Sequence, residues 1–248
     1  MNPDRSESCR PAIFASGCVL SIVYLASWFF EPTRPLWLAL DERVFWALND
    51  SLAWGTWWQV LWAAANNRAV DIVAGLAMIG LFAHYVLRRA RERTDFFVAV
   101  GVMLTGLILV GNRISAALPV ERRSATLVHP DALRLTELVP WIPTKDTAGD
   151  CFPGDHAMVL FICAGVITYY LPRAYAVAAW VLAVVFMAPR LVGGAHWLTD
   201  DLVGAAAVAG FVVSCALATP IHGVVTRRLE GWIGRCRARW AGRRRTRS

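Results

Sequence analysis

Long apolar runs without an internal charge are the feature that most constrains how this chain can fold. Hydrophobic residues make up 57% of the 248 residues, and they gather in runs instead of spreading evenly. The hydrocarbon core of a bilayer is about 30 Å thick, so a spanning helix needs roughly 20 mostly apolar residues. Several runs approach that length. The sequence therefore predicts an all-α, polytopic membrane protein.

Six segments fit this requirement, and one basic cluster sets their orientation. Arg88, Arg89, Arg91 and Arg93 follow the second segment, and positively charged loops tend to stay in the cytoplasm. This rule places both termini in the cytoplasm and the long loop before the fourth segment on the other side. The predicted spans are residues 12–30, 70–87, 96–110, 157–171, 174–188 and 202–219.

The segment between the first and second spans is predicted to lie along the membrane surface. Residues 35–50 mix apolar and charged side chains, and residues 52–65 carry four tryptophans. Tryptophan prefers the membrane–water interface, where its ring is buried and its N–H stays hydrated. A full span is the alternative for residues 52–65, but it would move the Arg88 cluster out of the cytoplasm. The prediction is a six-transmembrane-helix bundle with an interfacial helical segment.

Basic residues border the apolar runs. The formal net charge is +7, and positive flanks of membrane spans bind anionic lipid head groups. This pattern predicts membrane lipids as partners and argues against nucleic-acid binding. Residues 1–225 are predicted to form one membrane domain. Residues 226–248 are predicted to be a basic cytoplasmic tail anchored on acidic lipid, with a partner-binding role as the alternative.

The junction of the fifth and sixth spans carries the clearest catalytic pattern. Arg190, His196 and Asp200 follow one another there. If the last helix begins near His196, Asp200 lies one turn on, so its carboxylate can accept from one imidazole nitrogen and leave the other as a nucleophile. The Arg190 guanidinium can bind phosphate oxygens. A structural His–Asp pair is the alternative, and Asp201 competes as partner.

A second candidate region leads directly into the fourth span. Gly154, Asp155 and His156 follow Pro153, and backbone N–H groups at such a helix start can bind an anion. His156 could protonate a leaving phosphate oxygen. The alternative is a helix start that Asp155 merely caps, with His156 at the interface.

A third candidate region is the long polar loop before the fourth span. It contains Arg122, Arg123 and Lys145, which is the only lysine of the chain. Positive side chains can neutralise the charge that develops during phosphoryl transfer, although they could also bind acidic head groups nonspecifically. All three regions fall on the same predicted side of the membrane. Together they supply what phosphoryl transfer without a metal or other cofactor needs: a nucleophile, a general acid and a phosphate cradle.

These residues resemble the type 2 phosphatidic acid phosphatase superfamily. Arg190-x5-His196-x3-Asp200 fits the third superfamily motif, Ser-Arg-x5-His-x3-Asp, in every spacing. The resemblance implies that His196 is the nucleophile, Asp200 its partner, Arg190 a phosphate ligand and His156 the general acid. It also implies a six-helix membrane bundle that acts without a metal.

Three departures from the superfamily pattern narrow the resemblance. Pro189 stands in place of a serine, and Gly154-Asp155 replaces the Ser-Gly of the second motif. The first motif lacks its lysine, for which Lys145 or Arg113 is a candidate substitute. Together with residues 65–71 and 143–146, the departures resemble the lipid A phosphotransferase subgroup.

The resemblance implies a reaction at the periplasmic face of the bacterial inner membrane. Members of that subgroup transfer the terminal phosphate of undecaprenyl pyrophosphate to the 1-phosphate of lipid A and release undecaprenyl phosphate. Undecaprenyl pyrophosphate and lipid A are therefore the expected partners. The alternatives are a lipid pyrophosphate phosphatase of the same fold and, from a different class, a non-enzymatic lipid carrier.

Overall fold

The protein is built from helices and connecting loops. The computed structural model describes residues 11–245, with side chains described up to residue 240, and it has no strand within residues 11–245. The all-α class is therefore confirmed. In chain order the helices are α1 (Pro11–Phe29), α2 (Arg34–Asn49), η2 (Asp50–Trp54), α3 (Thr56–Ala65), α4 (Arg68–Arg89), η3 (Arg91–Arg93), α5 (Thr94–Ala116), α6 (Ala125–Val128), α7 (Leu135–Leu138), α8 (Asp155–Tyr170), α9 (Arg173–Val192), η4 (Asp200–Ala205), α10 (Ala206–Leu217) and α11 (Ile221–Arg245).

Five stretches of the described chain are long and apolar enough to cross a membrane. They are α1, α4, η3 together with α5, α9, and η4 together with α10. These stretches coincide with five of the six predicted spans. The remaining predicted span, residues 157–171, falls on α8, an apolar helix of 16 residues. At a rise of 1.5 Å per residue α8 extends about 24 Å, so the six-span count stays a prediction.

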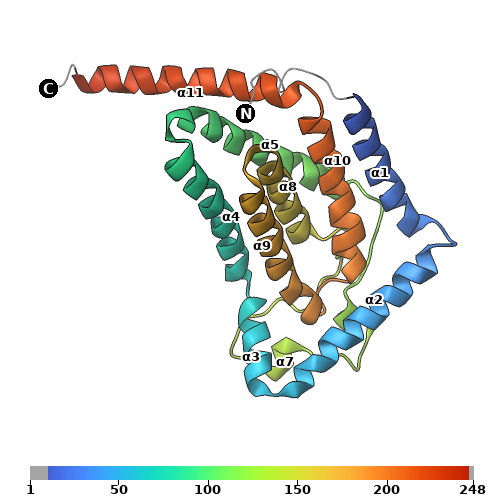
Figure 1. Cartoon of the computed structure of the whole chain (residues 1–248). Coiled ribbons are helices and arrows are strands. Elements are labelled where there is room, and N and C mark those ends of the chain that lie inside the picture. The colour runs from blue at the N-terminus through green and yellow to red at the C-terminus, as the bar shows by residue number, and fades with distance from the viewer. Residues whose placement is uncertain (1–10, 246–248) are drawn as a thin grey trace.

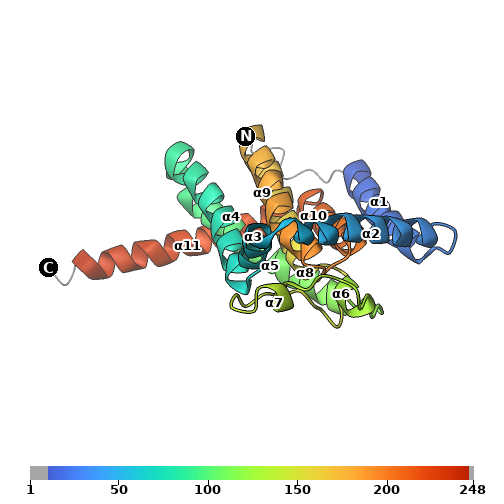
Figure 2. The same cartoon turned by 90° about the horizontal axis from the view of Figure 1, so that it is seen from below.

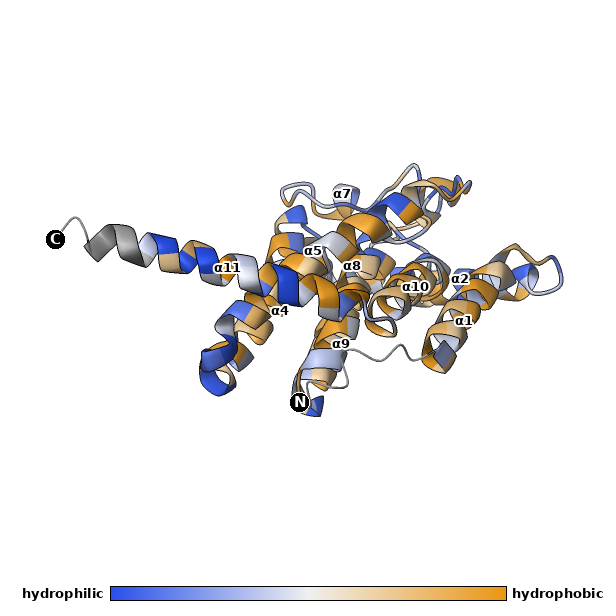
Figure 3. Cartoon of the chain, turned by 90° about the horizontal axis from the view of Figure 1, so that it is seen from above, coloured by the Kyte–Doolittle hydropathy of each residue, from blue (hydrophilic) through white to orange (hydrophobic). Residues whose placement is uncertain are grey.

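The helix α8 is the centre of the bundle, because α5, α9 and α10 all pack against it. Most of its side chains are buried, which is the expected place for a helix that is apolar on every face. The outer helices instead expose large apolar side chains such as Ile72, Leu76 and Val181. Figure 3 shows the apolar colouring of these helices and the hydrophilic turn after α4. Such an apolar outer surface suits contact with lipid.

Two groups of helices lie at opposite ends of the bundle. The helices α2, α3 and α7 lie at one end, and α11 lies at the other (Figure 1). Viewed from the end that carries them, α2 and α3 lie across that end of the bundle (Figure 2). The helix α3 has 10 residues and extends about 15 Å, too short to span a bilayer, which agrees with the predicted interfacial segment.

The helix α11 projects away from the bundle at the end opposite α2 (Figure 1). It packs along α5, and Arg237 forms a salt bridge with Asp95 near the start of α5. The predicted division between residues 225 and 226 falls inside this continuous helix.

Candidate active site

The three predicted regions meet at the end of the bundle where α2, α3 and α7 lie. The loop between α9 and α10 carries His196, the start of α8 carries Asp155, and the loop before α8 carries Lys145. The charges of Asp155, Lys145 and Arg190 all act on the His196 imidazole. The helix ends thus bring together residues that are far apart in the sequence.

His196 is held with one ring nitrogen occupied and the other free. The side chain is 4% exposed, and its Nδ1 lies 3.1 Å from the carbonyl oxygen of Cys151. A carbonyl only accepts hydrogen bonds, so Nδ1 carries the proton and Nε2 presents its lone pair. This Nε2 is buried and has no hydrogen-bond partner among the described residues. The imidazole is therefore set as a nucleophile.

Burial lowers the pKa of His196 below its usual value, because the charged form loses hydration. The positive charges of Lys145 and Arg190 lower this pKa further, whereas Asp155 and the Cys151 carbonyl raise it. The lowering effects prevail, so the ring is neutral at pH 7 and can attack an electrophile.

Asp200 does not accept the hydrogen bond from His196 that the sequence predicts. Its Oδ2 lies 3.8 Å from His196 Nδ1, too far for a hydrogen bond, and instead accepts from the backbone N–H of Trp197 at 2.7 Å. The expectation assumed that both residues stand on one helix. His196 precedes the helix, which starts with the π-helical turn η4, and the Cys151 carbonyl takes the expected role of Asp200.

Arg122 is bound to carboxylates, whereas the sequence suggested a phosphate ligand. Its guanidinium donates to Asp41 and to Asp200, each at 2.6 Å, and to the Thr199 hydroxyl at 2.8 Å. The guanidinium also lies over the rings of Trp28 and Trp197. Two acidic partners and two aromatic rings leave Arg122 few free donors. Its role here is to tie α1 and α2 to the loop that carries His196.

Asp41 is a site-supporting residue that the sequence did not single out. It is 1% exposed, and besides Arg122 it accepts from the backbone N–H and the hydroxyl of Thr199, at 2.8 and 2.6 Å. In the sequence, Asp41 stands in the segment 35–50, which mixes apolar and charged side chains and carries no motif. Only the packing of α2 on the His196 loop brings it to Arg122 and Thr199.

Arg190 is also buried and fully engaged. It is 4% exposed, donates twice to the Asp71 carboxylate at 2.8 Å, and donates to the Asn66 side chain at 2.8 Å. Asp71 in turn lies 3.6 Å from Nδ1 of His156. Arg190, Asp71 and His156 therefore form one chain of contacts, and the Arg190 charge acts on His196. Asp71 and Asn66 belong to residues 65–71, one of the segments that resemble the lipid A phosphotransferase subgroup. The sequence did not predict a role for either residue.

The start of α8 contributes to the site through close packing, and not through a free Gly154 N–H that could bind an anion. The Gly154 N–H donates to the Asp200 carbonyl at 2.9 Å, so it is not open to an anion as expected. A Cβ added at Gly154 would lie 2.0 Å from Asp201 Oδ1, and only glycine fits there. Asp155 accepts from the N–H of His156 at 2.7 Å. Gly154 thus lets α8 approach η4, the turn that precedes α10.

Lys145 and Arg123, the two remaining cations of the predicted site, lie in different surroundings. Lys145 is partly buried, its carbonyl accepts from the Asn66 side chain at 2.8 Å, and its charge reaches His196. Arg123 is exposed, and its carbonyl accepts from the Trp197 indole at 3.0 Å. Lys145 therefore belongs with the site, whereas the Arg123 side chain is not gathered into it.

Comparison with known proteins agrees with this geometry. The PAP2 superfamily model matches residues 130–227, a range that includes His156, Arg190, His196 and Asp200. The lipid A 1-diphosphate synthase of Escherichia coli (strain K12) is 35% identical over 207 residues, which cover 82% of this chain and 87% of that protein. No solved structure matches the chain significantly. Because the similarity extends over most of both chains, this protein belongs to the PAP2 superfamily.

Proposed function

We propose that this protein transfers the terminal phosphate of undecaprenyl pyrophosphate to the 1-phosphate of lipid A through a phosphohistidine at His196. Superfamily membership and the similar lipid A 1-diphosphate synthase support an enzyme that handles lipid phosphates. The observation that carries the mechanism is the buried His196, whose Nε2 has no partner within the described part of the chain while Nδ1 donates to the Cys151 carbonyl.

The first half-reaction forms the phosphoenzyme. The Nε2 lone pair of His196 attacks the terminal phosphorus, the P–O bond to the bridging oxygen breaks, and undecaprenyl phosphate leaves with the bonding electrons. Phosphorylation at Nε2 makes the ring cationic. The Cys151 carbonyl at 3.1 Å and the Asp200 carboxylate at 3.8 Å from Nδ1 stabilise that cation.

His156 is the proposed general acid of this step. Its Nδ1 lies 3.6 Å from Asp71. Burial lowers the pKa of His156 although Asp71 raises it, so protonation of the ring depends on the negative charge of the bound donor beside it. Its Nε2 can then protonate the leaving oxygen. The positive charges of Arg190 and Lys145 beside His196 stabilise the negative charge on the transferring group.

The second half-reaction restores the enzyme. An oxygen of the lipid A 1-phosphate attacks the phosphohistidine while its proton passes to His156, the P–N bond breaks, and the bonding electrons return to Nε2. A phosphatase of the same fold would use water in this step, so the two activities differ only in the acceptor. A lipid carrier would form no phosphohistidine.

The test follows a labelled terminal phosphate of undecaprenyl pyrophosphate in detergent, with and without lipid A, by thin-layer chromatography. Transfer of the label to lipid A is expected for the native protein and for His84→Ala, a control histidine that lies in α4 and bonds to Tyr175. No transfer is expected for His196→Ala. Label found only as free phosphate would make the protein a lipid pyrophosphate phosphatase.

A further inference from the structure

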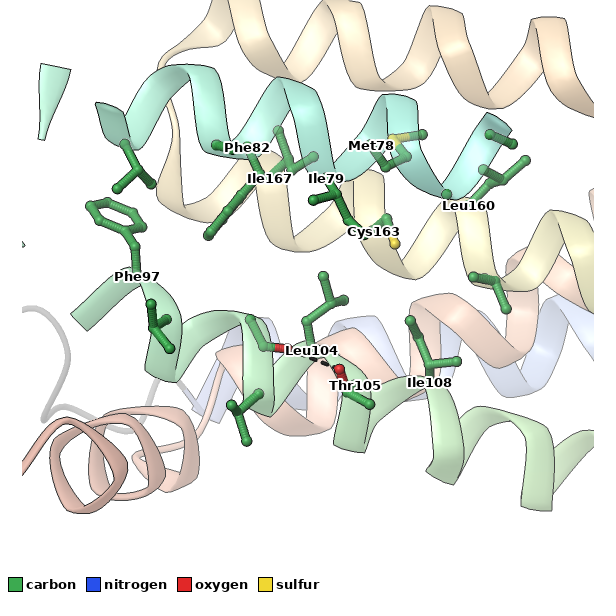
Figure 4. Close-up of a pocket in the computed structure, with 18 of the residues that line it drawn as sticks. Met78, Ile79, Phe82, Phe97, Leu104, Thr105, Ile108, Leu160, Cys163 and Ile167 are labelled. Atoms are coloured by element: carbon green, nitrogen blue, oxygen red, sulfur yellow. Dashed lines mark hydrogen bonds between the residues drawn. The ribbon is translucent and has the colours of Figure 1, made fainter. Parts of the chain in front are cut away.

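An apolar groove lies between α4, α5 and α8, beside the catalytic residues. Its volume is about 670 Å³, within the range of ligand-binding cavities. Figure 4 shows Met78, Ile79 and Phe82 on one side and Leu104 and Ile108 on the other. The side chains that line this space are almost entirely hydrocarbon, so its natural content is a hydrocarbon chain.

One end of the groove opens at the catalytic residues. Asp71 and His156 line that end, and Asp71 holds Arg190 with two hydrogen bonds at 2.8 Å. A lipid whose chain lies in the groove therefore has its head group next to Arg190, Asp71 and His156. The same geometry gives the groove a polar end and an apolar body, as an amphipathic ligand requires.

The groove continues toward the opposite membrane face. Leu87 and Thr94 line it at the turn between α4 and α5, far from the catalytic residues. The helix between Asp71 and Leu87 extends about 24 Å, most of the roughly 30 Å hydrocarbon core. Along this length, the hydroxyl of Thr105 is already bonded to the Gly101 carbonyl. A long chain can thus lie in the groove without leaving a polar group unsatisfied.

We infer that this groove binds the single hydrocarbon chain of the pyrophosphate donor and makes donor consumption depend on the length of that chain. The inference rests on the proposed function. A one-chain lipid can place the part of its only chain that is nearest the head group in this elongated space between three helices. A multiply acylated acceptor could place only one of its chains there. The acceptor is therefore expected to approach His196 from outside the groove.

Glycines allow the groove to be filled without disturbing the fold. Gly75 and Gly101 line it, and an added Cβ at either would meet nothing within 4 Å. Gly101 stands midway along the part of α5 that lines the groove. Gly80 and Gly106 lie on the same two helices and have equally open surroundings, but they do not line the groove. The four positions give matched test and control variants.

The experiment measures consumption of undecaprenyl pyrophosphate and of geranyl pyrophosphate, a short isoprenoid donor, by each variant. Gly101→Leu should lower kcat/KM for the undecaprenyl donor about tenfold, mainly through KM, because burial of several methylenes is lost. It should leave the geranyl donor unaffected. Gly75→Leu, near the catalytic end, should impair both donors. Gly80→Leu and Gly106→Leu should match the native protein, and no variant should change the KM of lipid A.

Equal effects of Gly101→Leu on both donors, or none on either, would overturn the inference, as would a raised KM for lipid A with an unchanged donor KM. Thermal midpoints in detergent report folding. If Gly101→Leu does not fold, Val98→Phe fills the same groove closer to Thr94 and should show the same dependence on chain length. Donor consumption is read at steady state with lipid A and as single-turnover phosphoenzyme formation without it, so the groove is tested even if the acceptor proves to be water.

Discussion

At the scale of single residues, His196 depends on partners that differ in kind from those the motif suggests. A backbone carbonyl, that of Cys151, fixes the ring, and the carboxylate of Asp200 holds the adjoining loop. A carbonyl is neutral, so it orients the imidazole without drawing it strongly toward the protonated form. The neutral ring required for attack is favoured by burial and by the positive charge of Lys145.

Replacing Lys145 should change the pH dependence of catalysis. Lys145 lowers the pKa of His196, so Lys145→Ala should raise that pKa and move the acid limb of kcat/KM to higher pH. Arg123→Ala, at an exposed position, should leave the acid limb in place. A pH profile that extends below the His196 pKa of about 4 checks this, and an acid limb that stays unmoved in Lys145→Ala would contradict the assigned role.

The lowered pKa of His196 also makes the free energy of unfolding depend on pH. The unfolded chain binds a proton near the ordinary pKa of about 6.5, and the folded protein does not. The contribution of His196 therefore lowers the free energy of unfolding as the pH falls below about 6.5. His196→Ala should reduce this loss.

Asp41 should matter for stability as much as for activity. Asp41→Ala would leave Arg122 with one of its two buried carboxylates, and breaking such a pair costs about 3 kcal/mol. Unfolding in detergent should show this loss, while Asp50→Ala, at the exposed end of α2, should cost little. A native-like unfolding midpoint for Asp41→Ala would mean that Arg122 does not depend on α2.

At the scale of elements, the close contact of α8 with η4 sets the shape of the site. Gly154→Ala should destabilise the protein by about 1–3 kcal/mol through overpacking, because the new Cβ would meet Asp201 Oδ1. The double variant Gly154→Ala/Asp201→Ala should recover part of this loss. Gly149→Ala, where the added Cβ has open space, is the control. Additive effects in the double variant would exclude direct contact as the cause.

The sequence could predict elements whose signal is local. Apolar runs predict α1, α4, α5, α9 and α10, and the motif spacing predicts that Arg190 and His196 belong to one site. It could not predict the contacts of Asp41 or Asn66, because these depend on how α2 and the connection before α4 pack on distant loops. The hydrogen bond predicted between His196 and Asp200 is absent for a related reason: the spacing of four residues suggested a regular helix, and His196 lies before that helix.

At the scale of the whole molecule, the proposed orientation places the catalytic end in the periplasm and α11 in the cytoplasm. Cys236 is exposed on α11, and Glu121 is exposed on the catalytic side. A membrane-impermeant maleimide should label Glu121→Cys in intact spheroplasts and Cys236 only after permeabilisation, with Cys236→Ser as the control. The reverse labelling pattern would invert the orientation.

The apolar groove connects the membrane-facing helices with the catalytic residues. The groove between α4, α5 and α8 runs across most of the apolar thickness, and its catalytic end is lined by Asp71 and His156. The helices α2 and α3 lie at that end, and α2 supports the His196 loop through Asp41. The groove and the contact of Asp41 with Thr199 therefore join the helical bundle and α2 to the catalytic residues.

The most direct test of the central claim is to look for the phosphohistidine itself. The native protein is incubated with undecaprenyl pyrophosphate labelled in its terminal phosphate, without lipid A, and quenched in alkali, where a P–N bond survives. The account predicts acid-labile label on His196, its transfer when lipid A is added, and no label in His196→Ala. Label of native amount in folded His196→Ala would contradict it.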